Sequence, residues 1–256
     1  MLEYGMDQDT LGKKIFILYP QSVIQDELLD ILIMAGFESY ILHDHKRALK
    51  LLAQFPDSIM FINIDEKLPE KEWEEYVRGI QEDPQTKNCK LGILSYNTDK
   101  ALMQKYLMDI SVPCGYIQLK LGIKESTKIM LGALEANEAR GKRKYIRALC
   151  AADANATVNI KGSSGFYFGT ILDISAAGIA ARFEKFEELP PNTLIREMQL
   201  KLRGGLVLTD AVLMGKRNDN VLIFLFDVTR MNPDHKLVIH RFIKYTLQHY
   251  IDSLKI

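Results

Sequence analysis

KKIFILYPQSVIQDELLDILIMAGF, residues 13–37, decides the fold of the first half of this 256-residue chain. It opens with a short apolar run rich in β-forming residues, which predicts a buried strand. The remainder predicts a helix, because its apolar residues share one face: Ile24, Leu28, Ile31, Leu32 and Ala35. Gly36 supplies a stop signal. One strand followed directly by one amphipathic helix is the unit from which α/β folds are built.

The same strand-then-helix pattern recurs along the chain to residue 140. Further strands are expected at 38–43, 58–64, 90–96 and 115–119, and helices at 45–55, 70–81, 99–110 and 125–140. Five buried strands joined by helical crossovers predict a doubly wound parallel sheet. We therefore expect a flavodoxin-like domain over residues 1–137.

The second half changes period, with short β-rich runs separated by turn residues. Six strands are expected, at 156–160, 166–175, 178–184, 192–202, 206–217 and 221–228. A helix follows, with Asn232 as its N-cap, Pro233 at its first position and an apolar stripe of Ile239, Phe242, Ile243, Tyr250 and Leu254. We expect a six-stranded antiparallel barrel with a C-terminal helix over residues 147–256, after a linker at 138–146.

The charge is balanced over the chain but divided between its halves. Residues 1–140 hold 16 Lys and Arg against 22 Asp and Glu, a net of −6, which leaves 17 and 11, a net of +6, for residues 141–256. A basic half suggests an anionic partner. No apolar run approaches the roughly 18 residues of a membrane span, and the acidic N-terminal segment does not resemble a signal peptide, so we expect a cytoplasmic chain without membrane insertion.

Metal and disulfide chemistry have little support in the sequence. The three cysteines lie far apart without a CxxC pair, so buried reduced thiols are expected. His43 and His45 lie two apart across a strand end and the turn after it, where we expect them to point to opposite faces. His235, His240 and His249 miss the i, i+4 spacing of a helical zinc pair. We expect solvated histidines, no metal site and no cofactor. The sequence has no phosphate-binding loop, no nucleophile elbow and no paired-carboxylate site, so we do not expect enzymatic activity.

Two short segments stand out in the second half. KRKYIRALC, residues 142–150, packs four cations into six residues and spaces Arg143 and Arg147 four apart. DISAAG, residues 173–178, lies at the end of the second long strand of the expected barrel. Taken alone, the first segment suits a solvated helix end and the second suits a turn between strands.

Together these segments resemble the two-part signature of PilZ domains, a family that binds the bacterial second messenger cyclic di-GMP. The signature is R-x-x-x-R on the way into a β-barrel, then D-x-S-x-x-G after the second strand. All five positions match in order: Arg143, Arg147, Asp173, Ser175 and Gly178. The resemblance implies a cyclic di-GMP receptor in a bacterial signalling protein.

These residue types suit such a ligand, which carries two ring phosphates and two guanines. Arginine forks onto phosphate oxygens or onto guanine O6 and N7, and it also stacks on a purine face, so Arg143 and Arg147 are the leading candidates. The carboxylate of Asp173 can accept from guanine N1 and N2 hydrogens, and Ser175 can add one bond. Gly178 permits a close backbone approach or a positive φ.

The first half resembles a response-regulator receiver domain, with five strand–helix units in about 140 residues. A hydroxyl at Ser95 and a lysine at Lys120 lie near where a receiver keeps these groups. A working receiver also needs acids after its first strand to hold Mg²⁺ and an aspartate at the end of its third strand to accept phosphate.

The acidic centre of a receiver is missing here. Tyr19 and Pro20 follow the first strand, and Asn63 stands at the acceptor position, with Asp65 two residues further on. Too few hard oxygen ligands remain for a divalent cation, and an amide cannot form an acyl phosphate. We therefore expect a degenerate receiver-like domain that serves packing or protein contacts.

The sequence thus predicts a receptor that binds cyclic di-GMP and acts on a protein partner, with no nucleic-acid partner. One alternative is an interaction scaffold that works without nucleotide. The other is a phosphorylated response regulator, which Asn63 disfavours.

Overall fold

A computed structural model describes residues 12–150, 155–163, 165–217 and 220–256. The chain forms two compact units, one that reaches Lys144 and includes Ser253–Ile256, and one over Tyr145–Asp252. Compactness does not test independent folding, so the domain bounds given above remain predictions. The N-terminal segment discussed above lies outside the described residues. No helix in the described part of the chain is long and apolar enough to cross a membrane.

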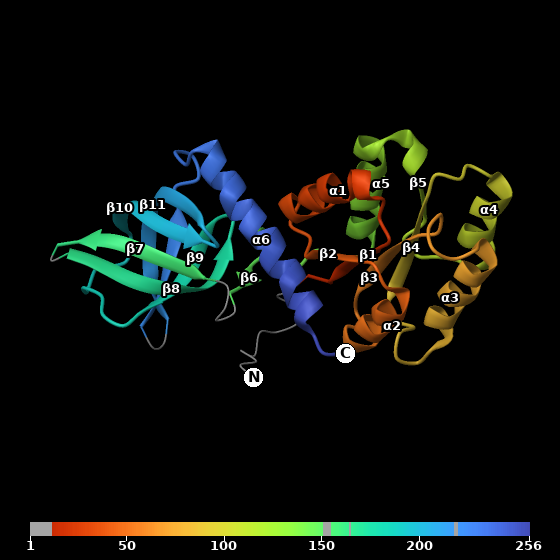
Figure 1. The fold of residues 1–256 in the computed structure, drawn as a ribbon, viewed down its shortest axis with the longest axis horizontal. Helices are drawn as coiled ribbons and strands as arrows, with labels where there is room; N and C mark the ends of the chain where they lie inside the picture. Colours follow the sequence, from red (N-terminus) through yellow and green to blue (C-terminus); the bar gives the residue numbers. More distant parts are fainter. Residues whose placement is uncertain (1–11, 151–154, 164, 218–219) are drawn as a thin grey trace. The chain divides into compact units, whose positions relative to one another are not determined.

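The first unit contains a five-stranded parallel sheet (Figure 1). Its strands are β1 (Ile15–Leu18), β2 (Ser39–Leu42), β3 (Ile59–Asn63), β4 (Lys90–Ser95) and β5 (Tyr116–Gln118). They lie in the order β2-β1-β3-β4-β5, which is the flavodoxin-like order. The predicted doubly wound sheet is therefore confirmed.

Helices cover both faces of this sheet, with α1 and α5 on one face and α2 and α3 on the other (Figure 1). They are α1 (Ser22–Met34), α2 (His45–Gln54), α3 (Glu70–Glu82), α4 (Lys100–Gln104) and α5 (Ile123–Ala136). A π-helical turn over Lys105–Asp109 continues α4, and a 3₁₀ turn over Leu119–Leu121 precedes α5. The helix expected at 99–110 is thus α4 together with the π turn.

Helix α1 buries a different face from the one expected. Leu28 and Leu32 are buried as predicted, but Leu29 and Ile33 complete the buried face, while Ile24 and Ile31 are only half-buried. The helix packs against α5 as well as the sheet, so its buried stripe is turned relative to the simple pattern. Gly36 ends it as predicted, with φ of 88°.

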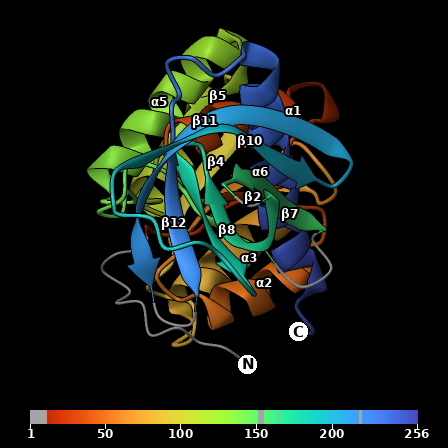
Figure 2. The same cartoon turned by 90° about the vertical axis from the view of Figure 1, so that its left-hand side faces the viewer.

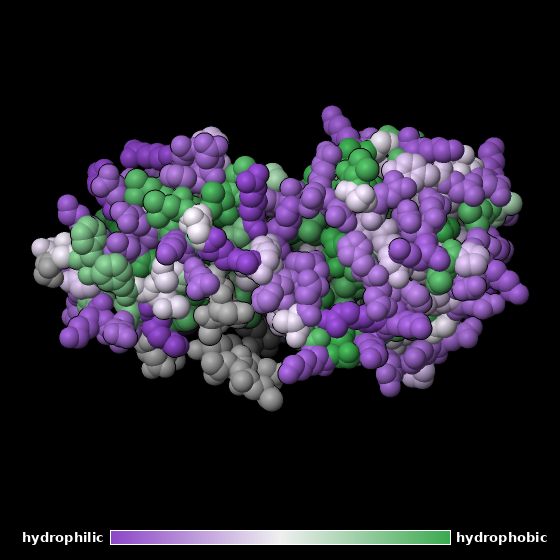
Figure 3. Space-filling model, in the orientation of Figure 1, coloured by the Kyte–Doolittle hydropathy of each residue, from purple (hydrophilic) through white to green (hydrophobic). Residues whose placement is uncertain are grey.

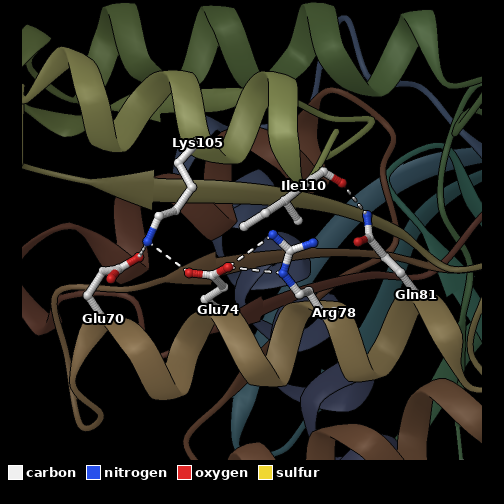
Figure 4. Close-up of polar contacts among 6 residues, drawn as sticks. All are labelled: Glu70, Glu74, Arg78, Gln81, Lys105 and Ile110. Atoms are coloured by element: carbon white, nitrogen blue, oxygen red, sulfur yellow. Dashed lines mark hydrogen bonds and ion pairs between the residues drawn. The ribbon is translucent and has the colours of Figure 1, made fainter.

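The acidic helix α3 is joined to the π-helical turn after α4 by an ion-pair network (Figure 4). Lys105 Nζ lies 3.0 Å from Glu70 Oε1 and 2.8 Å from Glu74 Oε2. The second carboxylate also accepts a 3.0 Å hydrogen bond from Arg78 Nε. One lysine therefore bridges two carboxylates one helical turn apart and ties the short α4 segment to its neighbour.

The aromatic side chains of α3 turn inward and gather around a histidine. Trp73 is fully buried, and Tyr76 donates a 2.8 Å hydrogen bond to the His45 carbonyl oxygen. His45 Nδ1 lies 3.0 Å from Tyr19 Oη, and its ring packs edge-on against both α3 rings. The expectation of a solvated His45 is wrong, because this ring is half-buried in an aromatic cluster, whereas His43 is exposed.

The Lys105 network predicts a pH-dependent contribution to stability. Hydrogen bonds from Lys105 and then Arg78 lower the pKa of Glu74, and hydrogen bonds to Glu74 and Glu70 raise the pKa of Lys105. A lowered carboxyl pKa stabilises the fold above its ordinary value of 4.5, and this stabilisation is lost as pH falls through the folded-state pKa. A raised lysine pKa stabilises the fold below 10.5, and this is lost at higher pH.

Urea unfolding of wild type and Lys105→Met should therefore differ near pH 7 by at most about 1 kcal/mol, since the pairs lie at the surface. The difference should fade toward pH 3. Lys87→Met, at an exposed lysine of the same unit, is the control and should change little. A Lys105→Met effect that stays constant between pH 3 and pH 7 would contradict the assignment.

The second unit is a closed antiparallel barrel (Figure 2). Its strands are β7 (Ala156–Gly162), β8 (Gly165–Ser175), β9 (Gly178–Phe183), β10 (Thr193–Leu202), β11 (Gly205–Arg217) and β12 (Val221–Phe226). They follow the order β8-β7-β10-β11-β12-β9, and β9 pairs back onto β8 to close the barrel. The predicted six strands are confirmed, and a two-residue strand, β6 (Ala148–Leu149), is added on β8.

The chain ends in helix α6 (Pro233–Ser253), as predicted. The Asn232 Oδ1 accepts a 2.8 Å hydrogen bond from the Asp234 amide, which confirms the N-cap. The expected apolar stripe is correct over its first half only. Its second half is wrong, because Ile251 follows Leu247 by one helical turn and is buried, while Tyr250 points outward.

Candidate functional site

A β-bulge in β8 turns two of the predicted ligand residues toward the outside of the barrel. In the pairing with β9, Ile171 lies opposite Ala181 but Asp173 lies opposite Ala180, so Leu172 is the extra residue. The bulge shifts the alternation and brings Ile174 into the interior, where it is fully buried. Asp173 therefore faces the outer side of the sheet, and Ser175, two residues further on, faces the same side.

The short strand β6 brings Arg147 to this place. Ala148 pairs with Ile174 and Leu149 with Asp173, along the edge of β8 that β7 leaves unpaired. Arg147 directly precedes this strand, and its Nη1 lies 3.7 Å from Asp173 Oδ1. The structure thus joins one residue of the R-x-x-x-R segment to the first residue of the D-x-S-x-x-G segment by an ion pair.

The two partners of this ion pair differ in exposure. The Asp173 side chain is 9% exposed and that of Arg147 is 32% exposed. A nearly buried carboxylate needs a cationic or hydrogen-bonding partner. Asp173 therefore holds the guanidinium group of Arg147 in position from its more buried side. A guanidinium has five N–H donors, and one carboxylate oxygen does not use them all.

Ser175 and Gly178 form the tight turn between β8 and β9. The Ser175 hydroxyl donates to the Gly178 carbonyl oxygen at 3.3 Å and accepts from the Ala177 amide at 3.3 Å. The hydroxyl therefore holds the turn together. Its remaining acceptor capacity is what it could offer a ligand.

Gly178 is required by a close approach between two strands. A Cβ at this position would lie 2.1 Å from the Phe224 carbonyl oxygen on β12. The φ of Gly178 is not positive, so of the two reasons given above, close backbone approach applies. The close neighbour is the backbone of β12 in the same barrel. Gly178 therefore allows the turn to pack against β12.

Two neighbours of this site carried no signal in the sequence. Leu149 lies opposite Asp173 on the outer side and is 67% exposed. Cys150 is half-buried, and burial, with the nearby Asp173 carboxylate, raises the pKa of its thiol to about 12. The pairing of β6 with β8 shows that these residues flank the ion pair. The sequence of a two-residue strand is too short to predict which strand it pairs with.

Arg143 is placed differently from Arg147. Arg143 is half-buried and lies at the end of the first unit, outside any helix or strand, whereas Arg147 belongs to the second unit. Four residues of chain limit the separation of their Cα atoms to about 14 Å. The structure therefore brings together Arg147, Asp173, Ser175 and Gly178, and Arg143 remains a site prediction.

At the carboxyl end of the parallel sheet, the positions compared above with the acidic centre of a receiver hold neutral or hydrogen-bonded groups. Asn63 ends β3 and is fully buried, and its Nδ2 donates to the Tyr19 carbonyl oxygen at 2.9 Å. The Asp65 carboxylate accepts two 2.6 Å hydrogen bonds, from the Ser95 hydroxyl and the Tyr96 amide. Lys120 lies exposed in the turn after β5. Within the described ranges, no group of three His, Cys, Asp or Glu could hold a metal ion.

Comparison with known proteins gives likeness in fold only. No protein-family profile and no curated protein matches this chain. Over its C-terminal part the chain is similar to the solved PilZ domain of YcgR from Escherichia coli with c-di-GMP, at 16% identity and a TM-score of 0.36, covering 44% of this chain and 99% of that one. The PilZ domain of CeSA from a cellulose-synthesizing bacterium shows 19% identity and a TM-score of 0.30, over 38% and 94% of the two chains.

A third likeness is to apo MrkH of K. pneumonia, with 18% identity and a TM-score of 0.39 over 46% of this chain and 54% of that one. The second unit has the six-stranded barrel and C-terminal helix that were expected from its pattern of strands and turns. At these identities and TM-scores the likeness carries no argument about the ligand.

Gly178→Ala should destabilise the barrel by about 1–3 kcal/mol, because the added methyl group meets a backbone carbonyl that cannot rotate away. Thermal unfolding followed by circular dichroism would measure this. Gly79→Ala is the control, since nothing lies within 4 Å of the added Cβ on α3 and alanine favours a helix. Equal melting temperatures for Gly178→Ala and wild type would show that the close approach is wrong.

Incubation with acetyl phosphate and Mg²⁺ should leave the mass of the protein unchanged. Asn63 cannot form an acyl phosphate, and both oxygens of Asp65 are already hydrogen-bonded. Intact-mass spectrometry decides the question. A stoichiometric gain of one phosphoryl group, lost in Asp65→Asn, would restore the response-regulator alternative.

Proposed function

We propose that this chain is a receptor for cyclic di-GMP, without catalytic activity of its own, and that it passes the ligand signal to a protein partner. Arg143, Arg147, Asp173, Ser175 and Gly178 are its ligand site. No cofactor takes part in this proposal, because the ligand itself is the signal.

The Arg147–Asp173 ion pair is the observation that carries this proposal. It links the two sequence segments on the outer side of the barrel, next to the Ser175–Gly178 turn. A guanidinium oriented by a nearly buried carboxylate can present its other N–H groups to a phosphate or to guanine O6 and N7. The exposed Leu149 beside it offers an apolar surface to a purine ring.

The scaffold alternative makes a different prediction for the same residues. If the ion pair only fixed β6 on the barrel, the protein would need Arg147 for stability and not for a ligand. Titration with nucleotide separates the two functions, whereas a folding assay alone does not.

Isothermal titration with cyclic di-GMP should show binding that is weakened roughly tenfold to over a hundredfold by Arg147→Ala or Arg143→Ala, since a charge-assisted hydrogen bond contributes about 1.5–3 kcal/mol. Arg147→Lys should restore little, because lysine lacks the planar fork. Lys142→Ala, at the adjacent exposed cation, is the matched control and should lose little affinity. Unchanged isotherms for both arginine variants would reject the site.

Ligand binding should also change the segment that connects the two units. The four cations of residues 142–147 repel one another, and bound phosphates would neutralise them. Amide hydrogen exchange should then show added protection at 141–148 and 173–178 when cyclic di-GMP is present, with a further change on the first unit. Protection confined to the barrel would leave a binding module without a switch between the units.

A further inference from the structure

The outer surface of the barrel carries a continuous row of exposed side chains across five strands. Strand register places Arg182 of β9 opposite Thr170 of β8, which lies opposite Thr157 of β7. The row continues to Lys201 of β10 and Leu206 of β11. All five side chains are exposed. We call the surface formed by this row and the two neighbouring rows toward the β7–β8 hairpin the outer face.

Two aromatic side chains stand on the outer face. Phe166 and Phe168 of β8 are 56% and 71% exposed, although phenylalanine is normally buried. Lys161 of β7 is exposed directly opposite Phe166. In Figure 3 hydrophobic side chains gather at the end of the barrel where the β7–β8 hairpin lies. Residues two apart in a strand are separated by about 6.8 Å, so the two rings form a regular pair on one side of β8.

Amide groups occupy the centre of the outer face. Asn159 lies opposite Phe168 on one side and Gln199 on the other. Asn159 Nδ2 donates to Gln199 Oε1 at 3.4 Å. The Oδ1 of the same asparagine is buried and has no hydrogen-bond partner in the described part of the chain. This oxygen is not open to solvent, so only the exposed parts of the two half-buried amide side chains face a ligand from outside.

The three rows contain the cations Arg182, Lys161 and Lys201 and no acidic residue. Four carboxylates border these rows: those of Glu187 and Asp210 accept hydrogen bonds from the Ser163 hydroxyl and from a β10 backbone amide, and those of Glu184 and Glu197 belong to exposed residues. Within the three rows themselves, the outer face therefore presents three cations around its two aromatic rings.

We propose that the outer face binds single-stranded nucleic acid. Exposed aromatic rings on a sheet stack unpaired bases, cations follow the backbone phosphates, and side-chain amides meet base edges. The core of a protein–protein interface is depleted of charged residues, whereas this surface has three lysine and arginine side chains among its rings. Their charge is complementary to an anionic chain. This departs from the expectation, drawn from the sequence, that nucleic acid is not a partner, and it does not depend on the cyclic di-GMP site.

Fluorescence anisotropy with the full chain tests this proposal, using labelled dT₁₂ and U₁₂ strands and a 12-base-pair duplex at about 50 mM salt. Both single strands should bind more tightly than the duplex. A single-strand salt slope of about −0.7 per contacted phosphate gives roughly −2 for the three cations. The Phe166→Ala, Phe168→Ala double variant should bind at least about tenfold more weakly, because stacking on each ring is lost.

Matched controls separate the outer face from general effects. Leu225→Ala removes an exposed apolar side chain from β12, and Lys216→Ala removes an exposed cation from the far end of β11. Both should keep strand binding, as should Arg147→Ala, which acts on the other site. The double phenylalanine, Leu225→Ala and Lys216→Ala variants should melt like wild type.

Three outcomes would overturn the proposal: no strand binding at 50 mM salt, equal binding of single strand and duplex, or no effect of the double phenylalanine variant. Vesicles of phosphatidylserine serve as a further arm. Vesicle binding that depends on the same two rings, without strand binding, would assign the outer face to a membrane surface instead.

Discussion

The second unit depends on strand β8, because this strand pairs with β7 on one edge and with β9 on the other, and the pairing with β9 closes the barrel. Its first half pairs with β7, and its second half pairs with β9 on one edge and with β6 on the other. The barrel closes because this one strand pairs with both β7 and β9, and β6 is added on the edge that β7 leaves unpaired. The bulge at Leu172 lies where the partners change, which is where an extra residue bends and twists a strand most readily.

The candidate ligand site follows from that change of partner. Because β7 ends its pairing at Thr170, the edge of β8 beyond it is open to β6, and β6 carries Arg147 with it. The same bulge points Asp173 outward to meet the guanidinium. The turn that follows is held closed by the Ser175 hydroxyl and by the approach of Gly178 to β12. The closure of the barrel and the Arg147–Asp173 ion pair thus depend on one local irregularity.

Much of the architecture could be predicted from the sequence, since it depends on hydrophobic period. The parallel sheet, the six barrel strands and the Asn232 cap of α6 follow from patterns that extend over many residues. The two arginines and the Asp173–Gly178 segment were visible as motifs. Helix faces were less accurate, as α1 and Tyr250 show, because the direction of packing depends on neighbours far away in sequence.

The bulge and β6 could not be predicted. Strict alternation from Ile171 would put Asp173 on the interior side, and only the extra residue at 172 reverses this. The burial of His45 among Tyr19, Trp73 and Tyr76 was missed for a similar reason, since three separate elements supply the cluster. Local patterns predict elements, whereas irregular residues and clusters depend on which elements meet.

The central claim is that Asp173 and Arg147 together read a guanine nucleotide, and base discrimination tests it most directly. Titrate wild type and Asp173→Ala with cyclic di-GMP and with cyclic di-AMP, after confirming equal melting temperatures. The account predicts a strong guanine preference in wild type and a much smaller one in the variant, because the carboxylate accepts from N1 and N2 hydrogens that adenine lacks. Equal guanine preference in both proteins, or no binding of either nucleotide by wild type, would contradict it.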